Sequence, residues 1–304
     1  MTGGWPPQGA GPQPGWGPPV PPQSGWGPPV PPEPGPSWAQ LARPMRAVDD
    51  VRTGFSETYW RAEQGAAARA VGQRWGLPAA VAILGFNLLA FLLAPYLLTR
   101  ITPAVYVFAT ITPTVLAAAA VLVVSTTRGN GPVVDLGLPR GAAELYGYLR
   151  TGLGWGLLAL GGGLAAGWIL IATSGATPAQ ALTGSPVLPL GWRVAFAAWI
   201  VLGAPLGEEV LFRGLLWGAL EKRRGRVPLG WSWLGNRWVV LVVTAVLFAV
   251  WHREWWRLPV LVVGGLALGA ARMRSGSIVA SATAHSVNNT LPALGVVFAP
   301  LLLT

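Results

Sequence analysis

Long apolar segments constrain this chain more than any other feature of its sequence. The stretches 77–98 and 101–124 contain no charged residue, and each is longer than the about 20 helical residues that cross a bilayer. Of all residues, 52% are hydrophobic and only 11% are charged, whereas a soluble domain carries about 25% charged residues. The sequence therefore predicts an all-α fold, a polytopic integral membrane helix bundle.

The apolar stretches predict how this bundle is divided. Spans are expected at about 77–99, 101–125, 150–173, 190–220, 238–252, 258–271 and 276–304. The last stretch contains Pro292, which would divide it into two short helices. We therefore expect about seven or eight transmembrane helices, with N-terminal helices over 76–189 and a core over 190–304. No signal peptide is recognisable, so the first span is expected to insert and stay.

The N-terminal quarter of the chain differs in composition. The octapeptide GWGPPVPP occurs at 15–22 and again at 25–32, and such Pro-rich sequence favours solvated polyproline II. Residues 1–37 are therefore predicted to be a disordered Pro/Gly/Trp-rich tail, with a docking ligand for an aromatic groove as the alternative. Residues 38–75 are predicted to be a cytoplasmic amphipathic helix or a linker.

The net charge of +10 reflects membrane topology rather than nucleic-acid binding. The basic residues lie beside the apolar spans instead of forming one stripe, so anionic lipid headgroups are the expected partner. Six arginines precede the first span, which predicts a cytoplasmic N-terminus. All but one of the 21 basic residues are arginine, as in high-GC bacteria. We therefore expect a multi-pass protein of a bacterial plasma membrane.

Two further composition features bear on function. The chain has no cysteine, which excludes disulfides and thiolate metal sites. Gly152, Gly154, Gly156 and Gly161–Gly163 lie inside an apolar span rather than after a strand. These glycines are therefore predicted to allow close helix packing rather than to bind a nucleotide.

Ionisable side chains inside the spans point to a functional site. A charge at the bilayer centre costs about 2.5–3.5 kcal/mol on insertion scales, so it normally has a partner or a role. The strings GEEVLFRG, FAVWH and AHSVNN contain such groups in three separate spans, and they hold both histidines of the chain. The site candidates are Glu208, Glu209, Arg213, Phe248, His252, His285 and Asn289.

These residues are spaced for a common centre. Each of the three spans carries two of them four residues apart, which places both on one helix face. The pairs are Glu209 with Arg213, Phe248 with His252, and His285 with Asn289. At 1.5 Å per residue, Glu208, His252 and His285 lie about 20, 22 and 17 Å from the basic inner ends of their spans. Similar depth is what a single site requires.

Two chemistries fit this set of residues. In one, Glu208, His252 and His285 bind a divalent cation such as zinc and leave one position for water. In the other, no metal is needed: Glu208 acts as general base on a water that His252 orients, while His285 and Asn289 stabilise the oxyanion. In both, Arg213 is expected to pair with Glu209, and Phe248 is expected to belong to the core.

The three strings also resemble a known family. EExxxR at 208–213, FxxxH at 248–252 and HxxxN at 285–289 are similar to the motifs of the CAAX protease and bacteriocin-processing (CPBP/Abi) family. The resemblance covers residues 190–304, with 134–156 similar to its usual lead-in. It implies an intramembrane endopeptidase whose catalytic residues are Glu208, Glu209, His252, His285 and Asn289. Its substrates would be peptides or membrane proteins, and both zinc-dependent and metal-free mechanisms have been proposed.

Two non-protease functions are the alternatives. A membrane scaffold or bacteriocin self-immunity protein would keep the fold and the polar cluster without catalysis. An ion-coupled transporter would be expected to show repeated or interrupted spans, and the sequence shows no convincing pair.

Overall fold

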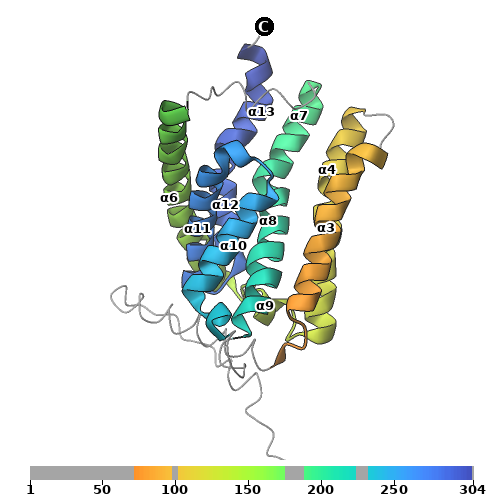
Figure 1. The fold of residues 1–304 in the computed structure, drawn as a ribbon, viewed down its shortest axis with the longest axis vertical. Helices are drawn as coiled ribbons and strands as arrows, with labels where there is room; N and C mark the ends of the chain where they lie inside the picture. Colours follow the sequence, from red (N-terminus) through yellow and green to blue (C-terminus); the bar gives the residue numbers. More distant parts are fainter. Residues whose placement is uncertain (1–71, 98–101, 175–187, 224–231, 303–304) are drawn as a thin grey trace, which may run out of the picture. The chain divides into compact units, whose positions relative to one another are not determined.

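The computed structural model describes residues 72–97, 102–174, 188–223 and 232–302, and within them every regular element is helical. The predicted all-α fold is thereby confirmed. The chain divides into two units, Met1–Arg43 and Pro44–Thr304, and all described helices belong to the second (Figure 1). The predicted tail at 1–37 and most of the predicted segment at 38–75 lie outside the described residues.

Five helical stretches of the described chain are long and apolar enough to cross a membrane. They correspond to α3 (Leu77–Leu97), α4 (Pro103–Arg128), α6 (Ala142–Ser174), a composite helix over 190–221, and η5 with α11 (Trp255–Arg257 and Leu258–Ser275). The apolar helix α10 (Arg237–Trp251) is shorter. Five predicted spans thus reach spanning length, and the remaining apolar segments form shorter helices.

The last predicted span is divided into two helices, α12 (Ile278–Asn288) and α13 (Thr290–Leu302). The division falls at Asn289 rather than at Pro292, which lies in the first turn of α13. Proline is tolerated there because the first N–H groups of a helix have no intrahelical acceptor. Two short helices were expected here, and only the position of the break differs.

The composite helix lies in the middle of the bundle. It consists of α7 (Leu190–Ala198), η2 (Trp199–Gly203), α8 (Ala204–Glu209), η3 (Val210–Leu216) and α9 (Trp217–Glu221). Every residue from 209 to 220 is buried, including the charged Glu209 and Arg213. In Figure 1, α3 and α4 lie on one side of α8, and α10, α11, α12 and α6 lie on the other.

Glycines of α6 allow close packing against α12. A Cβ atom at Gly152 would lie 2.5 Å from the Ala280 carbonyl oxygen, and one at Gly156 would lie 2.9 Å from the Ala284 carbonyl oxygen. The packing interpretation of these two glycines is therefore confirmed, whereas Gly154 and Gly161 face open space. This contact holds the helix that carries His285.

A polar layer joins the α9 end of the bundle to the first helices. Asp135, at the end of α5 (Pro132–Asp135), is fully buried and accepts hydrogen bonds from Trp75 Nε1 at 3.3 Å and Ser125 Oγ at 2.9 Å. Buried Arg272 of α11 donates to the Leu136 carbonyl at 3.0 Å. Lys222 donates to the Trp75 carbonyl at 2.7 Å. Because each buried charge has partners, this layer fixes the core helices to α3 and α4.

Candidate active site

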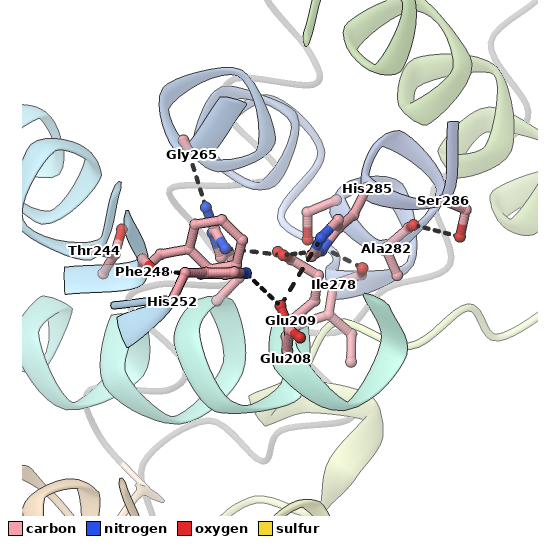
Figure 2. Close-up of polar contacts among 12 residues, drawn as sticks. Glu208, Glu209, Thr244, Phe248, His252, Gly265, Ile278, Ala282, His285 and Ser286 are labelled. Atoms are coloured by element: carbon pink, nitrogen blue, oxygen red, sulfur yellow. Dashed lines mark hydrogen bonds and ion pairs between the residues drawn. The ribbon is translucent and has the colours of Figure 1, made fainter. Parts of the chain in front are cut away.

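Three elements bring the predicted acidic and imidazole groups together (Figure 2). Glu208 and Glu209 form the last turn of α8. His252 is the C-cap of α10, and His285 lies on α12. Residues separated by more than 70 positions in the sequence thus share one centre, as their similar predicted depth requires.

Glu209 is the buried anchor of the site. Its side chain has no solvent exposure, and its Oε1 accepts from Arg213 Nη1 at 2.8 Å and from His285 Nδ1 at 3.1 Å. The second guanidinium nitrogen, Nη2, donates to the Gly265 carbonyl of α11 at 2.9 Å. A buried ion pair requires such additional hydrogen bonds to offset desolvation. The predicted pairing of Glu209 with Arg213 is therefore present.

Phe248 forms one wall of this anchor. The side chain is buried, and the Arg213 guanidinium lies 4.6 Å from its ring centroid. Its ring also contacts His252 and His285 edge-on, with centroid separations of 4.6 and 5.4 Å. A cation over an aromatic face is stabilised by the ring quadrupole, so Phe248 supports the charged groups as well as filling the core.

The hydrogen bonds of the two imidazoles determine which nitrogen carries the proton. His252 Nδ1 lies 2.8 Å from the Phe248 carbonyl, which can only accept. His285 Nδ1 lies 3.1 Å from Oε1 of the Glu209 carboxylate, which as an ionised group also only accepts. In the neutral form of each ring, Nδ1 is then the donor and Nε2 is left as an acceptor. Both Nε2 atoms face Glu208.

Glu208 differs from its neighbour in exposure and in partners. Its side chain is 20% exposed, and its Oε2 lies 3.8 Å from His252 Nε2 and 3.9 Å from His285 Nε2. This oxygen is buried and has no hydrogen-bond partner among the described residues. The separations exceed a direct hydrogen bond and are those that a bridging water spans. A small molecule with two donor hydrogens can therefore bind the carboxylate together with one of the imidazoles.

The same separations bear on the metal hypothesis. In a tetrahedral zinc site, donors bind at about 2.0–2.2 Å and lie about 3.4 Å from one another. The described residues contain no group of three or more His, Asp or Glu side chains arranged to hold a metal ion. Glu208, His252 and His285 therefore do not fit a metal as they lie here, and zinc ligation by them stays a prediction.

Asn289 makes a contact that the sequence did not indicate. Its side-chain Nδ2 donates to the Ile200 carbonyl of η2 at 3.0 Å, and its backbone N–H donates to the His285 carbonyl at 2.9 Å. The side-chain amide of Asn289 is thus hydrogen-bonded to the composite helix on the N-terminal side of α8. Sequence reasoning also missed the Gly265 carbonyl, because every residue carries a carbonyl and no side-chain pattern marks the one that is used.

The fold and the site together define a polytopic membrane protein with a Glu–His–Arg centre built from three apolar helices. Residues 190–291 match the type II CAAX prenyl endopeptidase Rce1-like family, and this range contains all three motifs. The chain therefore carries an Rce1-like type II CAAX prenyl endopeptidase domain of the CPBP/Abi family, a family of peptide-bond hydrolases. No curated protein and no solved structure matched the chain.

The match confirms the resemblance recognised in the three motifs. A domain of this family over residues 190–291 implies intramembrane protease activity, a bilayer environment and protein substrates. The matched range begins at the predicted start of the core, residue 190, and ends within α13.

Proposed function

We propose that the protein is an intramembrane endopeptidase that hydrolyses peptide bonds of membrane-associated proteins or peptides with a water activated by Glu208. One observation carries this proposal: Glu208 Oε2 lies within 3.9 Å of the Nε2 atoms of both His252 and His285 and has no other partner among the described residues. A water that donates one hydrogen to Glu208 and the other to an imidazole Nε2 is aligned for deprotonation by the carboxylate.

In the hydrolytic step, Glu208 acts first as a base and then as an acid. Glu208 takes a proton from the water as the water oxygen bonds to the amide carbon. His252, fixed by the Phe248 carbonyl, orients the water through Nε2. The tetrahedral intermediate collapses by breaking the carbon–nitrogen bond, and the proton on Glu208 passes to the leaving amine. Glu208 is thereby restored as a carboxylate.

Glu209 and Arg213 act through His285 rather than on the substrate. The ion pair holds His285 Nδ1 in a charge-assisted hydrogen bond, which orients its Nε2 toward the reacting centre. The fully buried position of Glu209 supports a positioning role. We further propose that the α9 end of the composite helix faces the cytoplasm, because Lys222 and Arg223 follow it directly.

The test compares new peptide ends in membranes of cells that express the wild type or Glu208→Ala at equal protein level. Ends that appear only with the wild type would support a protease and identify its substrate. Glu254→Gln is the matched control, because Glu254 is ion-paired with Arg257 outside the site and such surface pairs contribute little. An intact cellular function in Glu208→Ala, with no wild-type-specific ends, would instead support the scaffold or immunity function.

A further inference from the structure

The backbone hydrogen bonding of the composite helix is interrupted just before the glutamates. In η2, the Ala204 N–H donates to the Trp199 carbonyl, five residues back, which is the π-helical register. The next donor in that register would be the N–H of residue 205, with the Ile200 carbonyl as its acceptor. Residue 205 is a buried proline and has no N–H.

The Ile200 carbonyl therefore loses both of its helical donors. Its α-helical donor, the Ala204 N–H, is directed to Trp199, and its π-helical donor is missing at Pro205. A backbone carbonyl without a partner inside a membrane protein carries a substantial energetic cost. Asn289 supplies the missing hydrogen bond from its side-chain amide at 3.0 Å.

The same turn of α12 contacts the composite helix at a second point. His285, four residues before Asn289, donates to Glu209 at 3.1 Å. Ile200 and Glu209 are nine residues apart, which is about 13 Å along a helix. The His285–Asn289 turn thus contacts the composite helix on both sides of Glu208, at Ile200 and at Glu209.

The register of η2 determines the direction in which α8 presents its side chains. A π-helical turn accommodates one additional residue, which changes the phase of the following helix by about 100° relative to the preceding one. If η2 relaxed to α-helical register, Glu208 would be rotated relative to α7 and away from the imidazoles. The π segment must therefore be held, and Pro205 cannot hold it through its own backbone.

We propose that Asn289 is a positioning residue that replaces the N–H absent from Pro205 and so holds Glu208 in register with His252 and His285. This inference rests on the proposed function, because it assigns Asn289 to the helix that carries the general base. It differs from the role expected from the sequence, in which Asn289 contacts the oxyanion directly. The two roles predict opposite results when a donor is restored at position 205.

The decisive experiment is rescue by Pro205→Ala in the purified full-length protein, with a peptide that spans the Glu208-dependent cleavage site as the substrate. Asn289→Ala is expected to lower kcat about a hundredfold with little change in KM, as misplacement of a catalytic group does. In the double variant Pro205→Ala/Asn289→Ala, the backbone N–H restored at position 205 can reach the Ile200 carbonyl, so most of the lost kcat should return. A double variant as slow as Asn289→Ala would overturn the proposal.

Asn288→Ala provides the matched control. Asn288 is the preceding residue and the same amino acid, but its side-chain oxygen lies near Gly163 of α6 rather than near η2. We expect Asn288→Ala to keep the wild-type kcat, and Pro205→Ala to bring no gain in the Asn288→Ala background. A loss in Asn288→Ala equal to that in Asn289→Ala would contradict the specific contact with Ile200.

A second readout does not depend on catalysis. The wild type, Pro205→Ala, Asn289→Ala and the double variant form a double-mutant cycle. Their thermal unfolding in detergent measures the coupling between positions 205 and 289. Asn289→Ala should lower Tm less in the Pro205→Ala background than in the wild type, and additive shifts would refute the contact. Coupling without cleavage by the wild type would leave the contact standing and remove the proposed function. If Asn289→Ala does not fold, the double variant must fold for the proposal to stand.

Discussion

Glu208 and Glu209 are adjacent in the sequence and have the same side chain, yet their surroundings differ. Glu209 is fully buried and bonded to both Arg213 and His285. Glu208 is partly exposed, and its Oε2 faces two imidazoles at 3.8 and 3.9 Å. Glu209 is held in place through its Oε1 by Arg213 and His285, whereas Glu208 makes no short hydrogen bond through its Oε2 and is partly exposed, so it can act on a water. The first supports the structure of the site, and the second is available for chemistry.

The largest effect is expected from removing the base without changing its shape. Glu208→Gln should lower the cleavage rate by about 10²–10⁴-fold, the range for loss of a general base. Because Glu208 makes no short hydrogen bond through Oε2, Tm in detergent should stay near that of the wild type. The measurement pairs kcat with thermal unfolding on the same sample. Retained cleavage would mean that Glu208 is not the base.

Breaking the buried ion pair of Glu209 with Arg213 should lower the stability of the protein as well as its cleavage rate. Arg213→Met leaves the Glu209 carboxylate buried without its cation, which costs about 3–5 kcal/mol when one partner of a buried pair is removed. We expect a large fall in Tm or in the yield of folded protein, together with lost cleavage. Unfolding scans of detergent-solubilised protein check this. Wild-type stability with lost cleavage would instead place Arg213 in the chemistry.

A smaller effect is expected at Phe248, which packs against the Arg213 guanidinium. Phe248→Leu keeps an apolar side chain but removes the ring beneath the Arg213 guanidinium, a contact worth about 0.5–2 kcal/mol. Tm should fall modestly, and kcat should fall less than in Glu208→Gln because no reacting group is lost. Unfolding and rate measurements on this variant would sharpen the distinction between support and chemistry. A kcat as low as that of Glu208→Gln would show that Phe248 does more than support the ion pair.

The smallest effect is expected from metal removal. Because Glu208, His252 and His285 are not arranged here to hold a metal ion, dialysis against a strong chelator should leave the cleavage rate of the purified protein unchanged. The rate before and after dialysis, with metal content measured on both samples, checks this. Loss of cleavage that zinc alone restores would show that the enzyme needs zinc and would contradict this prediction.

Much of this site could be predicted because helix geometry is regular. Residues four positions apart share a helix face whatever surrounds them, so the pair of Glu209 with Arg213 and the shared centre with His252 and His285 could be inferred. The packing role of Gly152 and Gly156 could be inferred as well, because a small residue inside an apolar span allows close approach. In contrast, the sequence could not predict that Glu209 is buried while Glu208 is partly exposed. That difference depends on how deeply neighbouring helices cover each face of α8.

Asn289 shows where prediction from the sequence ended. Its motif indicated a site residue, but its partner is the backbone carbonyl of Ile200 on another helix. That carbonyl needs a donor only because η2 is π-helical and residue 205 is proline. The break between α12 and α13 likewise falls at Asn289 rather than at the proline that suggested it.

The membrane helices and the identities of the groups at the centre therefore follow from the amino-acid sequence alone. These depend on the length of apolar runs and on the constant pitch of the α-helix, both of which are local properties. The hydrogen bonds of Glu209, the partial exposure of Glu208 and the backbone carbonyl that Asn289 satisfies could be seen only in the folded bundle. These depend on distances between atoms of different helices, and such distances are set by packing across the whole bundle.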